Sequence, residues 1–135
     1  MDTQELHDRG LKLRQQMFGE AAVARRMNAF GEFGTPLQNI INAYAYGDVW
    51  QRDALPATTK SLAMVAMIAA LGKPNELRVH LNGALKNGAT PEQIQELLLL
   101  VALYCGIPAA NEAHQVAFDV INEREAPARP DALPL

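Results

Sequence analysis

Two apolar segments constrain the fold of this chain more than any other feature. They are SLAMVAMIAAL, residues 61–71, and IQELLLLVALYC, residues 94–105. As helices, both would be apolar around most of their circumference, which a surface helix of a small monomer does not tolerate. Their longest apolar runs reach only about half of the roughly 20 residues that cross a bilayer. We therefore expect buried core helices, with part of their surface in the interface of a homo-oligomer.

Helix starts and stops are legible along most of the chain. Polar caps precede apolar periodic runs, and glycines follow them. The predicted starts are Asp2 with Glu5, Thr35 before Pro36, and Thr90 with Gln93; the predicted stops are Gly72 and Gly88. These signals predict helices near 3–18, 20–31, 36–46, 57–71, 75–87, 91–104 and 108–124, and no stretch alternates like a strand. The expected fold class is all-α, a compact bundle of about six or seven helices.

Length and charge limit the classes of function. With 135 residues and a net charge of −3, the chain fits one domain and lacks the positive field that nucleic acid or an anionic membrane requires. We expect a single domain over residues 1–125 and a proline-rich tail over residues 126–135. The start, MDTQELHDRG, lacks the pattern of a secretion signal, so we expect a cytoplasmic protein.

His80 is the most informative titratable residue. It lies in the predicted helix NELRVHLNGALKNG, where Leu77, Leu81 and Ala84 form an apolar stripe on or beside its face. A histidine there is at least half hidden. Spacing alone leaves two interpretations open: a core-edge histidine with a satisfied hydrogen bond, or a general acid or base that titrates near neutral pH.

A polar segment, YGDVWQRDAL, places Asp48, Trp50 and Arg52 on a predicted connection after Gly47. The tryptophan can line a pocket between an acid and a base, or it can simply anchor a docked loop. Both interpretations stay open on spacing alone.

The chain has too few cysteines for a disulfide or a dithiol pair, and its histidines are too scattered for a metal site. Cys105 is the only cysteine, so no disulfide or dithiol pair can form within one chain, and its apolar surroundings favour a small, inert core residue. His7 and His114 are expected on solvated helix faces. The three histidines are too scattered to predict a metal site.

Two stretches make the chain similar to a known family. YGDVWQRDAL, followed by TTKSLAMVAMIAALGKPNELRVHLNGALKNGATPEQIQELLLLVALYCGIPAANEA, resembles the carboxymuconolactone decarboxylase family from about Tyr44 to Val120. Asp48 stands where that family often has glutamate, and Lys60 stands where arginine is common. The wider superfamily includes alkylhydroperoxidase-D-like proteins that use a CxxC pair. Here Pro108 replaces the second cysteine, so that chemistry lacks its resolving thiol.

The resemblance implies a compact helical subunit, commonly a trimer or hexamer, that converts γ-carboxymuconolactone to 3-oxoadipate enol-lactone during protocatechuate breakdown. It implies no cofactor and no metal, and a small carboxylated lactone as the partner. By analogy with the family, His80 would transfer the proton or stabilise the oxyanion, and Asp48 would orient it or relay the proton. Arg52 would hold a substrate carboxylate, with Lys60 and Arg78 in reserve. Trp50 and Cys105 would line the pocket.

Other functions stay open beside this one. The chain can be a family member that isomerises, cyclises or hydrolyses a related lactone, because a fold does not fix a reaction. It can also be a catalytically silent, oligomeric binding protein. A peroxidase acting through Cys105 alone would need an external thiol and an activated thiolate.

Overall fold

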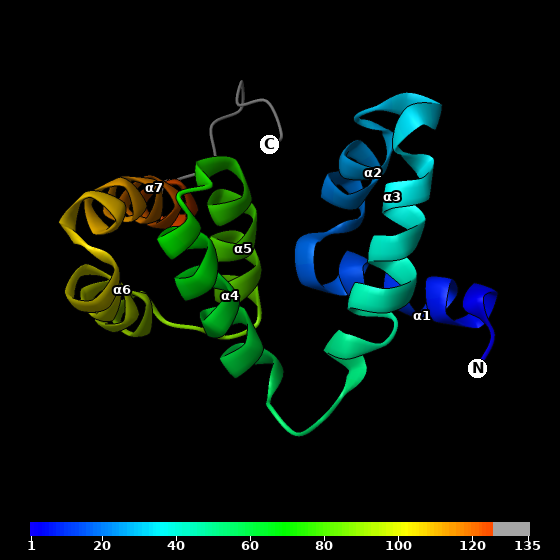
Figure 1. The fold of residues 1–135 in the computed structure, drawn as a ribbon, viewed down its shortest axis with the longest axis horizontal. Coiled ribbons are helices and arrows are strands. Elements are labelled where there is room, and N and C mark those ends of the chain that lie inside the picture. Colours follow the sequence, from blue (N-terminus) through cyan, green and yellow to red (C-terminus); the bar gives the residue numbers. More distant parts are fainter. Residues whose placement is uncertain (126–135) are drawn as a thin grey trace. The chain divides into compact units, whose positions relative to one another are not determined.

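The computed structural model describes residues 1–125, and the tail predicted over residues 126–135 lies outside them. Within the described residues all regular structure is helical (Figure 1). Chain contacts divide the molecule into an N-terminal unit, residues 1–56, and a C-terminal unit that begins at Ala57. The single domain expected over residues 1–125 stays a prediction.

The N-terminal unit contains six short or medium elements. They are α1 (Thr3–Phe18), α2 (Glu20–Asn28), the 3₁₀ helix η1 (Gly31–Gly34), α3 (Thr35–Ile40), the π-helix η2 (Ile41–Tyr46) and the 3₁₀ helix η3 (Val49–Gln51), followed by a connection to residue 56. Helix α1 packs along η2. Asp2 caps α1, because its carboxylate accepts a 2.8 Å hydrogen bond from the Glu5 N–H.

Two helix predictions in this unit need correction. The helix expected over residues 20–31 ends at Asn28, since Gly31 has a φ of 55° that an α-helix does not accommodate. Thr35 was expected to cap the next helix, but it is the first helical residue, follows Gly34, and makes no capping hydrogen bond. The helix expected over residues 36–46 continues past Ile40 as a π-helix, which directs Asn42, Ala43 and Tyr46 inward.

A buried polar network joins the elements of the N-terminal unit. The Arg14 guanidinium donates to Gln38 Oε1 at 2.8 Å and to Asn42 Oδ1 at 3.0 Å, and it lies 5.8 Å from the centre of the Tyr46 ring. Asn42 Nδ2 lies 3.2 Å from His7 Nε2. The sequence placed His7 on a solvated face, whereas this contact leaves it half-buried. The network holds α1 against α3 and η2.

We expect Arg14→Leu to destabilise the protein strongly. The substitution removes the donor shared by two buried amide oxygens, and each unsatisfied acceptor costs about 1–3 kcal/mol. Urea unfolding followed by circular dichroism measures the loss. Arg25→Leu on the exposed side of α2 is the matched control, with an expected change within about 0.5 kcal/mol. Equal effects of the two substitutions would contradict a structural role for the network.

The C-terminal unit is built from four longer helices, α4 (Ala57–Leu71), α5 (Pro74–Lys86), α6 (Pro91–Cys105) and α7 (Ile107–Glu125). Helix α5 packs against α4 and α7, and α6 packs against α7 and α4 (Figure 1). Their buried faces share one apolar core that includes Val65, Leu81, Ile94, Leu98 and Val120. The two apolar segments therefore do supply core helices, as predicted.

The predicted boundaries of the C-terminal unit are largely confirmed. Thr90 Oγ1 accepts from the Gln93 N–H at 3.1 Å, while Gln93 Oε1 accepts from the Thr90 N–H at 3.0 Å, which forms the expected capping box. Gly72 and Gly88 follow helix ends with φ values of 68° and 99°. Among the helices of residues 1–125, none has the length and apolar character that a membrane span needs.

Candidate active site

His80 lies on the inner side of α5. Helix α5 begins at Pro74, and its buried positions fall one turn apart, so that His80 shares a face with Leu77 and Ala84. Only 8% of the residue is exposed. The prediction that His80 is at least half hidden is therefore confirmed. An imidazole held in this way has few orientations, which suits a group that must present one nitrogen to a substrate.

Arg78 occupies a different side of α5 and is already engaged. Its guanidinium binds both carboxylate oxygens of Glu123 on α7, and the side chain is about one-third exposed. The pair links two helices of the C-terminal unit. A substrate carboxylate at Arg78 would have to displace the carboxylate of Glu123.

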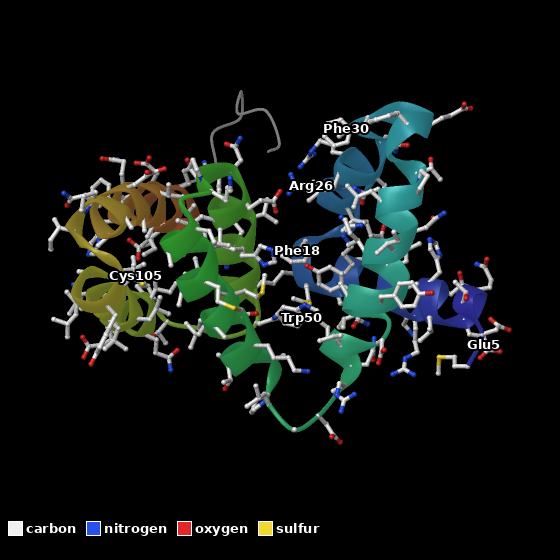
Figure 2. All side chains as sticks on the ribbon, in the orientation of Figure 1. Glu5, Phe18, Arg26, Phe30, Trp50 and Cys105 are labelled. Carbon is white, nitrogen blue, oxygen red and sulfur yellow. The ribbon has the colours of Figure 1, made fainter. Side chains whose placement is uncertain are left out.

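Cys105 is exposed, which corrects the expectation of a small core residue. It is the last residue of α6, and Gly106 then turns the chain with a φ of 104° toward α7 (Figure 2). The apolar composition of the segment suggested burial. However, the inward positions of α6 are Ile94, Leu98 and Val101, and the final turn extends beyond the core.

Asp48, Trp50 and Arg52 surround η3 in the N-terminal unit. Trp50 is half-buried and stacks on Tyr46, with ring centres 5.7 Å apart and an interplanar angle of 17°. Gln51 Nε2 donates to the Tyr46 carbonyl oxygen at 3.0 Å. These contacts support the interpretation of Trp50 as the anchor of a docked segment. Asp48 and Arg52 are exposed on either side of it.

The six predicted site residues thus divide equally between the two units. His80 and Arg78 share α5 but use different faces, and Cys105 lies at the end of α6. Asp48, Trp50 and Arg52 are neighbours around one short helix. Their assignment to a single active site stays a prediction.

An apolar groove between α4 and α6 was not predicted from the sequence. This open groove has a volume of about 590 Å³ and is lined by Leu62, Ala63, Ala66, Leu97 and Leu100 together with Thr59, Glu92, Gln93 and Glu96. The groove has no cationic side chain, so it does not suit a carboxylated substrate. Helical periodicity places its residues on two faces, but the sequence does not reveal that these faces adjoin.

The structure contains no ready metal site among residues 1–125. No three histidine, cysteine, aspartate or glutamate side chains in this part of the chain converge closely enough to hold an ion. His114, the exposed histidine of α7, lies with its Nδ1 2.7 Å from the Ala110 carbonyl oxygen.

Comparison with known proteins places this architecture in a family. The sequence pattern of the carboxymuconolactone decarboxylase family matches residues 35–119. The chain is 37% identical over 123 residues to the 4-carboxymuconolactone decarboxylase of Acinetobacter baylyi, covering 91% of this chain and 92% of that protein. It is also 36% identical over 118 residues to the nitrosuccinic acid decarboxylase of Metarhizium robertsii, covering 87% and 82% of the two chains.

A third relative extends the comparison without naming an activity. An uncharacterised 15.0 kDa protein of Paracoccus denitrificans is 31% identical over 83 residues, which cover 59% of this chain and 61% of that protein. The family match covers more than half of the chain and includes η3, α5 and α6, the elements that carry the predicted site residues. The chain therefore belongs to the carboxymuconolactone decarboxylase family.

Proposed function

We propose that this protein is a decarboxylase that converts γ-carboxymuconolactone to 3-oxoadipate enol-lactone with release of carbon dioxide, a step of protocatechuate breakdown in the β-ketoadipate pathway. The observation that carries the proposal is the 37% identity, across 91% of the chain, with a protein named 4-carboxymuconolactone decarboxylase. The exposed Asp48 and Arg52 beside η3 and the buried His80 of α5 give the proposal candidate residues.

The proposed reaction uses an electron sink that the substrate itself provides. The departing carboxylate is bonded to the ring carbon beside a ring double bond, and that double bond is conjugated with the lactone carbonyl. When the carbon–carbon bond to the carboxylate breaks, its electron pair moves through the double bond to the carbonyl oxygen. The resulting oxyanion then collapses as the ring carbon next to the carbonyl takes a proton. The protein must bind the carboxylates, stabilise the oxyanion and supply that proton.

His80 is the proposed group for the proton or the oxyanion. The residue is 8% exposed and lies on the core face of α5, and histidine is the side chain best suited to proton transfer near neutral pH. Asp48 is the proposed partner that orients the imidazole or relays the proton. Arg52 is the proposed carboxylate ligand, because an exposed guanidinium can form two parallel hydrogen bonds. Trp50, Cys105 and Arg78 are proposed as surrounding groups.

A nitrosuccinate is the second candidate substrate, and the 36% identity with a nitrosuccinic acid decarboxylase favours it. In nitrosuccinate, loss of the carboxylate beside the nitro group would place the electron pair on the nitro oxygens, and protonation at carbon would follow. Both candidate substrates therefore combine a departing carboxylate, a conjugated acceptor and a second carboxylate. The same three tasks would serve either one.

A proton NMR time course on the purified full chain tests the choice between these substrates. We expect γ-carboxymuconolactone to be consumed with formation of the enol-lactone, at a rate that a metal chelator does not change. Turnover of nitrosuccinate alone would replace the proposed substrate while leaving decarboxylation in place. Hydrolysis or isomerisation without carbon dioxide, or no turnover of either compound, would overturn the proposal.

We expect Arg52→Gln to weaken substrate binding more than Arg78→Gln. Loss of a charged hydrogen bond to a carboxylate should raise KM about tenfold to a hundredfold with little change in kcat. Arg78→Gln should leave KM close to the unaltered value, since Glu123 already binds that guanidinium. Steady-state kinetics on both variants measures the difference, and the opposite order would assign the carboxylate to Arg78.

A further inference from the structure

The short helix η3 depends on contacts outside itself for its conformation. The Gln51 N–H donates to the Asp48 carbonyl oxygen at 3.1 Å, and the Arg52 N–H donates to the Val49 carbonyl oxygen at 3.3 Å. A 3₁₀ helix held by two such bonds is weak by itself, and none of the three residues of η3 is buried. The position of η3 is therefore set by the element on which it packs, which is η2.

Tyr46, the last residue of η2, holds η3 at two points. Its ring stacks on Trp50 with ring centres 5.7 Å apart and an interplanar angle of 17°, and its carbonyl oxygen accepts the 3.0 Å hydrogen bond from Gln51 Nε2. The stacked ring limits the tilt of the indole, while the hydrogen bond limits how far the segment can move away from η2. Together the two contacts restrict both rotation and separation of η3.

Tyr46 is itself held firmly in the N-terminal unit, where only 7% of the residue is exposed. The Arg14 guanidinium lies 5.8 Å from the centre of its ring, and the Phe18 ring meets it edge-on, with ring centres 5.8 Å apart and an interplanar angle of 88°. The next residue, Gly47, lies so close to α1 that a Cβ atom there would be 2.1 Å from the Leu6 carbonyl oxygen. The ring of Tyr46 is therefore a fixed platform for η3.

From these contacts we propose that Tyr46 is a positioning residue, which holds η3 so that Arg52 presents its guanidinium to a carboxylate of the substrate. This inference rests on the proposed function, in which Arg52 is the carboxylate ligand. Arg52 follows Trp50 by two residues, so the orientation of the stacked indole decides where the arginine side chain begins. Two parallel hydrogen bonds to a carboxylate require a defined direction of approach, and an unrestrained η3 would lose it. Tyr46 acts through Arg52 and need not touch the substrate.

Tyr46→Leu in the full chain tests this role, because leucine keeps an apolar side chain and removes the flat ring. Trp50 is the only tryptophan, so its fluorescence reports on η3 directly. We expect its emission to shift to longer wavelength and acrylamide to quench it more strongly, since the indole loses its cover. KM should rise about threefold to tenfold, the worth of an aromatic pair, with a smaller change in kcat. Tyr46→Phe keeps the ring and should keep both properties. Tyr44→Leu, at a half-exposed position of η2, is the matched control and should change neither.

A double-mutant cycle with Arg52→Gln separates positioning from a general loss of structure. If Tyr46 acts through Arg52, Tyr46→Leu should raise KM little further once the guanidinium is gone. Effects on KM that simply multiply in the double variant would overturn the proposal. An unchanged emission of Trp50 in a folded Tyr46→Leu variant would overturn it equally.

Gln51→Met provides a second test if Tyr46→Leu does not fold, which circular dichroism establishes. Gln51 is half-buried, and the substitution removes the other attachment of η3 without a change in the core. KM should rise about twofold to tenfold, the worth of a hydrogen bond, and only while Arg52 is present. The emission of Trp50 needs no substrate. If neither candidate substrate is turned over, the proposed function fails, while this emission still decides whether Tyr46 and Gln51 hold η3.

Discussion

His80→Asn is expected to lower kcat for decarboxylation of γ-carboxymuconolactone by about 10²–10⁴-fold, the range typical of a lost general acid or base. Asparagine can still donate one hydrogen bond from a similar position, but it cannot exchange a proton near neutral pH. If His80 supplies the ring proton, the chemical step therefore fails while substrate binding persists. Stopped-flow measurement of substrate loss, with KM determined separately, distinguishes these two effects.

The interpretation of this variant requires a folded protein, because His80 is 8% exposed and packs within the face of α5 that contains Leu77 and Leu81. The thermal midpoint of the variant measures any packing defect. His114→Asn is the matched control: this second histidine is exposed on α7, and the rate should stay near that of the unaltered protein. Full activity in a folded His80→Asn variant would assign proton transfer to another residue and leave His80 a core histidine.

Local sequence signals predicted much of the C-terminal unit. The Thr90–Gln93 capping box and the glycines after two helices depend on neighbouring residues only, and the structure contains all of them. The burial of His80 was also predictable, because a residue between Leu77 and Ala84 at helical spacing must share their face. Signals of this kind need no knowledge of distant contacts.

The N-terminal unit was harder to predict because its packing depends on contacts between distant segments. Nothing in the sequence distinguishes Arg14 from other polar residues of α1, because its partners Gln38 and Asn42 lie 24 and 28 residues away. The π-helix η2 contains no residue that a regular α-helix would exclude, so composition does not reveal it. The Arg78–Glu123 pair spans 45 residues and was equally hidden.

The sequence indicates which residues are candidates for the site, but it does not predict how exposed they are or what they contact. Exposure of Cys105 depends on where α6 leaves the core, which the apolar run through residues 97–105 conceals. The sequence is compatible with Trp50 as a pocket residue or as an anchor, and the stacking of Trp50 on Tyr46 depends on where η2 ends. The groove depends on the packing of α4 beside α6, a tertiary contact that periodicity in either helix alone does not reveal.

The close contact between α1 and η2 predicts a large effect of a small substitution, Gly10→Ala. A Cβ atom at Gly10 would lie 1.6 Å from the Asn42 carbonyl oxygen and 2.6 Å from the Gly47 nitrogen. Both neighbours are backbone atoms, so no side chain can rotate away to relieve the overlap. Helix α1 would have to separate from η2, which would also break the hydrogen bond from Arg14 to Asn42. We expect a loss of more than about 4 kcal/mol, beyond the range of most single substitutions.

Gly31→Ala in the same unit is the control that isolates the cause. Gly31 has a φ of 55° and open space around its Cβ position, so alanine there meets only the backbone cost of a left-handed conformation, about 1–2 kcal/mol. Urea unfolding of both variants, followed by circular dichroism, gives the loss of unfolding free energy in each. The comparison separates the cost of steric overlap at Gly10 from the cost of backbone strain at Gly31. If Gly10→Ala is no more destabilising than Gly31→Ala, α1 and η2 do not touch through their backbones. The Arg14 network would then lack the close approach that brings its donors and acceptors within reach.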